Sequence, residues 1–210
     1  MEIKTALGLL SVGLALVSYV PYLRDILART TKPHAYSWLT WTLLALIQFS
    51  LQIQNQGGPG SWLMGVTALL CFMIFLLALK YGEKSIKTID KLCLLTACLS
   101  LLIWQVSDLL LLSVMLIIIA DAVGGFFPTF RKSFNKPQEE TASIYFIYLI
   151  SLTVSIFALT ELTWVNALYP ATLVLLNGSL ALFLLWRRYV LRPIKSKRRT
   201  SSQTIVRAVR

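Results

Sequence analysis

The sequence predicts an all-α membrane protein with seven transmembrane helices. Two observations predict this class: 57% of the 210 residues are hydrophobic and only 14% are charged, and long apolar runs alternate with short polar breaks. A hydrocarbon core of ~30 Å requires about 20 helical residues for each crossing. A water-soluble fold is excluded, because its core would need far less apolar surface than this chain carries.

Seven apolar runs have the length of a membrane crossing. They are Thr5–Ile26, Ser37–Gln54, Trp62–Leu79, Thr88–Trp104, Leu109–Thr129, Ala142–Thr160 and Val165–Trp186. The first run is longer than the core of a signal peptide, so we expect it to remain in the mature protein. Turn-forming residues in the segment NQGGPGSW separate the second run from the third. The fourth run is the weakest, because two charged residues, Asp90 and Lys91, lie in its first turn.

Basic residues predict the direction of the crossings. Of the 20 Lys and Arg, all except Lys4 fall at or near the junctions of runs one and two, three and four, and five and six, or beyond the end of run seven. The positive-inside rule therefore places the N-terminus outside and the C-terminus in the cytoplasm. The same alternation accounts for the net charge of +11 without a nucleic-acid partner. We expect a multi-pass protein of the plasma (inner) membrane.

A repeat of 107 residues relates the two halves of the chain. Pro21 and Arg24 recur as Pro128 and Arg131 (128 − 21 and 131 − 24). The same shift pairs Trp38 with Tyr145, Trp41 with Tyr148 and Lys80 with Arg187. Four crossings separate equivalent positions, so the two three-helix repeats are parallel. The predicted units are a first repeat at 1–80, a linker helix at 81–108, a second repeat at 109–188 and a basic tail at 189–210.

The segments VPYLRDILARTTKPHAYSW and FPTFRKSFNKPQEETAS resemble the SWEET and PQ-loop superfamily of seven-helix membrane proteins. The resemblance covers roughly residues 5–188. The chain departs from the family pattern in having Pro21-Tyr22 and Pro128-Thr129 in place of Pro-Gln pairs. The resemblance implies a 3+1+3 arrangement of helices and transport of a small polar or ring-bearing solute by alternating access. KDEL receptors share this general fold, so a non-transporting receptor or sorting protein is the alternative.

Two polar residues lie deep in apolar runs. Asp121 is ten residues before Arg131, and Asn177 is ten residues before Arg187, so at ~1.5 Å per residue both are expected near the midplane. Intramembrane acids usually face the interior of a bundle. We expect Asp121 to couple a proton or bind solute, and Asn177 to bind solute. The alternative for both residues is a structural hydrogen bond between helices.

Aromatic and polar stripes on the second and sixth runs are candidates to line a cavity. Trp41, Gln48 and Tyr148 are the expected solute contacts, because flat rings and amides suit ring-bearing molecules. Trp38 and Tyr145 lie near the helix ends, where aromatic residues usually anchor a protein at the membrane interface. Pro21 and Pro128 are either hinges of an inner gate or helix terminators.

Other residues point to no cofactor, metal or catalytic site. The three cysteines lie in apolar runs, and His34 is the single histidine, so no metal set or disulfide framework is indicated. The buried ionisable residues form no constellation of nucleophile and base, so an enzyme is not expected. Glu139 and Glu140 are expected only to temper a basic loop. The tail is expected to bind anionic lipid, and the sequence leaves a homo-oligomer open.

Overall fold

The fold was analysed in a computed structural model that describes residues 2–83, 88–106 and 110–191. Within these ranges the regular structure is entirely helical. The helices are α1 (Glu2–Leu27), α2 (Ala35–Gln54), η1 (Gly58–Ser61), α3 (Trp62–Tyr81), α4 (Thr88–Val106), α5 (Leu110–Ala120), η2 (Asp121–Phe126), α6 (Phe127–Asn135), η3 (Pro137–Glu139), α7 (Ala142–Ala158) and α8 (Trp164–Val190). The predicted lipid-binding tail lies almost wholly outside the described residues.

The prediction of an all-α fold is confirmed, and the fold contains candidate membrane helices. Four helical segments are long and apolar enough to cross a membrane: Glu2–Leu27, Gly58–Tyr81, Leu110–Asn135 and Trp164–Val190. Helices α2, α4 and α7 coincide with the other three apolar runs. The number of crossings, their division into repeats and their orientation stay predictions.

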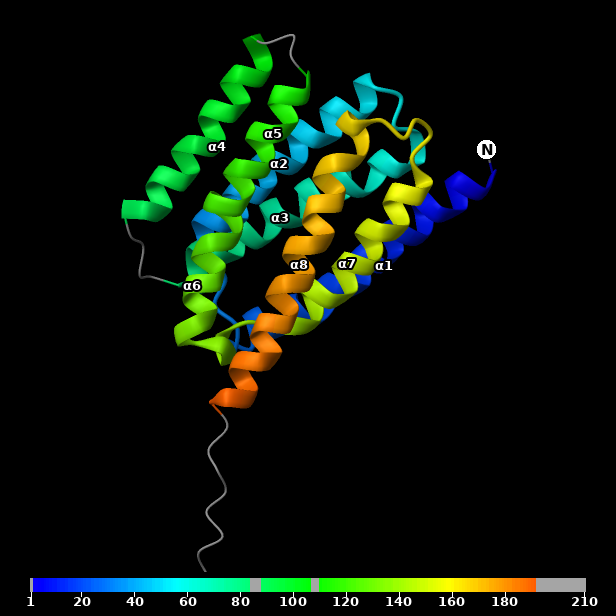
Figure 1. The fold of residues 1–210 in the computed structure, drawn as a ribbon. Helices are drawn as coiled ribbons and strands as arrows, with labels where there is room; N and C mark the ends of the chain where they lie inside the picture. The colour runs from blue at the N-terminus through cyan, green and yellow to red at the C-terminus, as the bar shows by residue number, and fades with distance from the viewer. Residues whose placement is uncertain (1, 84–87, 107–109, 192–210) are drawn as a thin grey trace, which may run out of the picture.

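Helices that are far apart in the sequence pack side by side in the bundle (Figure 1). Helix α1 lies along α7, α2 lies along α3, and α7 also packs on α8, whereas α4 sits at the margin against α2 and α5. Small residues bring α1 and α7 together, because the Ser151 hydroxyl donates to the carbonyl of Ser11 over 2.6 Å. Close approach through small side chains is typical of helices packed in a membrane.

One end of the bundle, which we call the glycine end, contains residues 55–61 and 159–166. Here the Lys4 ammonium donates to the carbonyls of Leu159 (2.7 Å) and Thr160 (3.0 Å). The Asn166 side-chain amide donates to the carbonyl of Asn55 over 2.8 Å. These bonds tie α1 and the two connecting segments at this end to one another.

Gly8 allows η1 to approach α1 at the glycine end. A Cβ atom at Gly8 would lie 2.8 Å from both Cβ and the carbonyl oxygen of Pro59. We expect Gly8→Ala to destabilise the protein by about 1–3 kcal/mol, the usual cost of overpacking. Gly13→Ala on the same helix is the matched control, because nothing lies within 4 Å of its added Cβ. Thermal unfolding in detergent should show a lower midpoint for Gly8→Ala alone, and equal midpoints would contradict the contact.

The other end, which we call the basic end, contains residues 24–34, 82–83 and 131–141. The Lys132 ammonium pairs with the Glu140 carboxylate at 2.5 Å, and both side chains are almost completely buried. Lys132 also donates to the carbonyls of Lys32 and Glu139. The expectation that Glu140 only tempers a basic loop is therefore wrong, because this carboxylate is a structural partner inside the bundle.

Neither candidate hinge proline ends a helix. Pro21 lies inside α1, which continues to Leu27. Pro128 lies in the first turn of α6, immediately after the π-helical segment η2. A proline has no backbone N–H, so it cannot bond to the carbonyl four residues earlier, here that of Gly124. π-Helical segments often mark functional sites, and this one carries Asp121.

Candidate functional site

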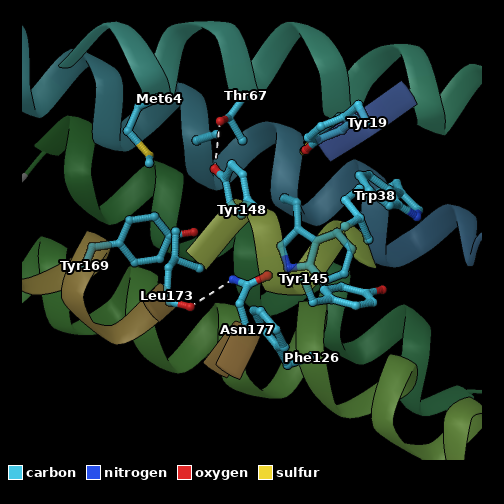
Figure 2. A pocket seen from close by; sticks show the side chains of 14 residues that line it. Tyr19, Trp38, Met64, Thr67, Phe126, Tyr145, Tyr148, Tyr169, Leu173 and Asn177 are labelled. Carbon is cyan, nitrogen blue, oxygen red and sulfur yellow. Dashed lines mark hydrogen bonds between the residues drawn. The ribbon is translucent and has the colours of Figure 1, made fainter. Parts of the chain in front are cut away.

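A small cavity lies inside the bundle. The lining residues are Tyr19, Trp38, Trp41, Ala45, Met64, Thr67, Cys71, Phe126, Ile144, Tyr145, Tyr148, Tyr169, Leu173 and Asn177. They come from α1, α2, α3, η2, α7 and α8, so both halves of the chain contribute. Figure 2 shows Tyr148, Tyr169 and Asn177 directed toward the same space.

Aromatic rings form a continuous row along the cavity. The ring centroids of Tyr148 and Tyr19 are 6.3 Å apart, and those of Tyr19 and Trp38 are 6.0 Å apart. Trp38 and Trp41 follow at 4.9 Å, and Trp41 and Phe126 at 5.4 Å. The planes of each neighbouring pair are steeply inclined, between 63° and 87°. Edge-to-face contacts of this kind fix the rings and leave their faces turned in several directions.

The tyrosine hydroxyls in the wall already have hydrogen-bond partners. The partners are Thr67 for Tyr148 (2.7 Å), Cys71 for Tyr19 (3.4 Å), Asp121 for Tyr169 (3.1 Å) and Glu140 for Tyr145 (3.2 Å). The Asn177 amide donates to the carbonyl of Leu173 over 2.8 Å, within its own helix. The polar atoms thus fix the orientation of the rings, and the cavity surface that remains is largely aromatic.

Asp121 lies directly behind this wall and is completely buried. Its Oδ1 accepts a hydrogen bond from the Trp41 indole N–H at 2.7 Å, and its Oδ2 accepts one from the Tyr169 hydroxyl at 3.1 Å. Both donors belong to residues that line the cavity. Among the described residues no lysine, arginine or histidine forms an ion pair with this carboxylate.

Gly125 makes the contact between Trp41 and Asp121 possible. A Cβ atom at position 125 would lie 2.2 Å from the indole Nε1 and 2.4 Å from Oδ1 of Asp121. The missing side chain of Gly125 provides the space in which the indole meets the carboxylate.

The predicted solute contacts are brought together only in part. Trp41, Tyr148 and Asn177 line the cavity, and Asp121 contacts two of its lining residues. Gln48 lies elsewhere, because its side-chain amide donates to the carbonyl of Val165 over 3.0 Å in the first turn of α8. It is absent from the lining and holds α2 against α8.

The expectation that Trp38 and Tyr145 anchor the protein at the membrane interface is wrong. Their side chains are 3% and 4% exposed and line the cavity. Each is drawn inward by a specific contact: Trp38 packs against Tyr22 and Trp41, and the Tyr145 hydroxyl donates to Glu140. Contacts inside the bundle therefore determine where these two side chains lie, although both residues are near a helix end.

Several lining residues were missed by the sequence analysis. They are Tyr19, Ala45, Met64, Thr67, Cys71, Phe126, Ile144, Tyr169 and Leu173. Tyr169 had a detectable signal, because Tyr169, Leu173 and Asn177 follow at four-residue intervals and so share one face of α8. Thr67 and Cys71 have the same spacing on α3. Nothing in the sequence distinguished their stripe from ordinary apolar packing.

The cavity is connected to the basic end through Tyr145. Its hydroxyl reaches Glu140, and Glu140 is paired with Lys132, so one hydrogen-bonded chain runs from the cavity wall to the loops. At the surface of this end Lys136 pairs with Glu83 at 3.1 Å. Hydrogen bonding to Glu83 raises the pKa of Lys136 above its ordinary value.

Among the described residues no group of three or more His, Cys, Asp or Glu side chains is arranged to hold a metal ion. The cavity offers aromatic faces, one amide and a nearby carboxylate.

Comparisons with known proteins give no match. No protein-family model matches the chain, and no curated protein or solved structure matches it.

Proposed function

We propose that the protein is a membrane transporter that moves a small polar or ring-bearing solute by alternating access. The observation that carries the proposal is the aromatic cavity at the centre of the bundle, lined by helices from both halves of the chain. A site between two halves can be exposed to either side when the halves rock against each other. The resemblance to the SWEET and PQ-loop superfamily supports the same conclusion.

The proposal includes seven crossings in a 3+1+3 arrangement, with two parallel repeats. Cavity residues support the repeat, because three pairs of lining positions are related by the same shift of 107 residues. They are Tyr19 with Phe126, Trp38 with Tyr145, and Trp41 with Tyr148. An aromatic residue occupies every one of these positions. Two equivalent helix triplets would place them symmetrically about a common axis, as a shared pathway requires.

Features at the two ends of the cavity support alternating access. The hydrogen-bonded chain from Tyr145 through Glu140 to Lys132 lies at the basic end, and contacts of Gly8, Lys4 and Asn166 lie at the glycine end. In the proposed topology the basic end is cytoplasmic, because it carries the positive loops. Pro21 and Pro128 lie in helices that run to the basic end. A proline removes a backbone hydrogen bond of its helix and so permits bending. We propose that these helices move when the inner side opens.

The test is solute flux into liposomes that contain the purified protein. The panel should contain labelled neutral sugars, nucleosides and organic cations, with empty liposomes as background. We expect time-dependent uptake of at least one class, and a loss of about tenfold or more in Trp41→Ala, which removes a central wall of the cavity. Phe72→Ala is the matched control, because Phe72 is 46% exposed on the outside of α3.

Two results would contradict transport. The first is an absence of flux over the whole panel from protein that is folded by thermal unfolding. The second is saturable solute binding without flux, which would favour the alternative of a receptor or sorting protein. Equal loss of flux in Trp41→Ala and Phe72→Ala would show that the cavity is not the pathway.

A further inference from the structure

The chemistry of the cavity wall narrows the class of solute. We propose that the cavity binds a small organic cation with a methylated, quaternary ammonium group and no carboxylate. The inference rests on the proposed function, because it assigns the solute of that pathway. Three features of the site support it: the faces of the aromatic rings, the tyrosine hydroxyls that already have hydrogen-bond partners, and the carboxylate without a cationic partner.

The first feature is the density of aromatic rings. Seven of the 14 lining residues are Tyr, Trp or Phe, and the inclined row from Tyr148 to Phe126 surrounds the space with ring faces and edges. The face of an aromatic ring attracts a cation that lies within about 6 Å of its centroid. Cages of several rings are the usual sites for quaternary ammonium groups, because a methylated cation presents no hydrogen-bond donor and binds through the faces.

The second feature is that the tyrosine hydroxyls of the wall already have hydrogen-bond partners. The hydroxyls of Tyr19, Tyr148 and Tyr169 are bonded to Cys71, Thr67 and Asp121 respectively. A sugar that entered the cavity would lose water from many hydroxyl groups and would find few free partners. Unsatisfied polar groups of this kind cost about 1–3 kcal/mol each. A quaternary ammonium group avoids this cost, since it needs no hydrogen bond.

The third feature is the sign of the charge at the site. Asp121 is completely buried, and within the described part of the chain its two oxygens accept side-chain hydrogen bonds only from the neutral donors Trp41 and Tyr169. An ionised carboxylate without a cationic partner is costly in the interior of a bundle. A cation in the cavity would provide the missing charge across a single layer of side chains.

The two donors also transmit this charge to the cavity. A hydrogen bond to a carboxylate polarises the donor group, so the Trp41 indole and the Tyr169 phenol become richer in electrons. The ring faces that line the cavity then attract a cation more strongly. This arrangement places the carboxylate behind the rings and makes direct contact with the ligand unnecessary.

The same features exclude a carboxylate on the ligand. No Lys, Arg or His belongs to the cavity lining. A zwitterion such as an amino acid would bring its own carboxylate next to Asp121 with no cation to pair it, and like charges at short range in a low dielectric repel strongly. The geometry therefore favours a simple cation over a zwitterion.

The experiment compares three probes of similar shape: choline, the neutral isostere 3,3-dimethyl-1-butanol, and the zwitterion glycine betaine. Thermal unfolding of the detergent-purified protein is measured over a concentration series of each probe, with NaCl replacing choline chloride to hold the ionic strength. A ligand that binds only the folded state stabilises it by RT ln(1 + [L]/Kd), so the unfolding midpoint keeps rising with the logarithm of the ligand concentration above Kd. We expect such a concentration-dependent rise with choline and none with the other two probes.

Three variants test whether choline binds at the proposed site. In Asp121→Asn the apparent affinity for choline should fall about tenfold or more, because the compensating charge is gone. Tyr169→Phe keeps the ring and removes the bond to Asp121, so it should weaken binding less. It also provides a second measurement if Asp121→Asn does not fold. Phe72→Ala should leave the response unchanged.

Each other outcome has a defined meaning. Equal responses to choline and the neutral isostere, or no response to choline, would overturn the inference, and flux of a neutral solute could still support the transporter. A response to glycine betaine as large as that to choline would overturn the exclusion of zwitterions. Binding of choline without choline flux into liposomes would uphold the inference and overturn the proposed function.

Discussion

Lys132→Met is expected to lower the free energy of unfolding by about 3–5 kcal/mol, the usual cost of removing one partner from a buried ion pair. The substitution leaves the Glu140 carboxylate buried, with the Tyr145 hydroxyl as a donor but without its cation. It also removes the donor to the carbonyls of Lys32 and Glu139. Chemical or thermal unfolding in detergent measures the loss.

Two further variants separate this effect from a general loss of charge. Lys136→Met breaks the ion pair with Glu83, in which the lysine side chain is 49% exposed, and should change stability by less than about 1 kcal/mol. Lys132→Met combined with Glu140→Met removes both buried charges and should recover most of the stability lost in the single variant. A single variant as stable as Lys136→Met, or a double variant no better than the single, would contradict the assignment.

The all-α membrane class could be predicted from the sequence because it depends on composition and on the length of apolar runs. Both quantities are properties of a single segment at a time, and they need no knowledge of neighbours. The ends of some helices could be predicted for the same reason. Lys80 and Arg187 lie at the boundaries of apolar runs, and α3 and α8 end within a few residues of them. Pro21 does not mark a helix end in this way, because α1 continues beyond it to Leu27.

The site was predicted in part because some of its residues are chemically conspicuous. A carboxylate, an amide and a tryptophan in apolar runs, namely Asp121, Asn177 and Trp41, are costly or unusual there, and this cost made them candidates. Gln48 met the same criterion, but its partner is a backbone carbonyl in α8. The sequence shows that a buried polar group needs a partner without showing which partner it has.

The remaining residues of the site depend on contacts between distant segments. Trp38 and Tyr145 are buried because partners from other parts of the chain surround them, and Glu140 is buried because Lys132 is brought to it across the loop. Gly125 has its role only because an indole from α2 arrives beside it. Contacts of this kind are set by tertiary packing, so they cannot be predicted from the local sequence pattern.

Gly125→Ala is expected to cause the largest functional loss for the smallest chemical change. The added methyl group would lie 2.2 Å from the Trp41 Nε1 and 2.4 Å from Oδ1 of Asp121, far inside van der Waals contact, so the indole must move and its hydrogen bond to the carboxylate must break. We expect solute binding and flux to fall about tenfold or more, equivalent to about 1.4 kcal/mol per tenfold. Saturation binding and liposome uptake measure the change.

Gly178→Ala is the matched control for this substitution. It lies in α8 beside Asn177, and its added Cβ would have only one neighbour, the Cδ2 atom of Leu149 at 3.9 Å, an ordinary contact. Both substitutions exchange glycine for a better helix former. A difference between them therefore reports the contact at the cavity and not the helix propensity. Equal activity of the two variants would show that the Trp41–Asp121 contact is not needed.

A double-mutant cycle tests the cause of the loss. Trp41→Phe removes Nε1, the atom nearest to the new methyl group, so Gly125→Ala should cost much less in this background than in the native protein. The bond to Asp121 is already absent in Trp41→Phe, and the methyl group has no indole to displace. Additive losses would mean that Gly125 acts elsewhere, for instance as a flexible point beside Pro128. A strongly non-additive result would assign its role to the space in which the indole meets the carboxylate.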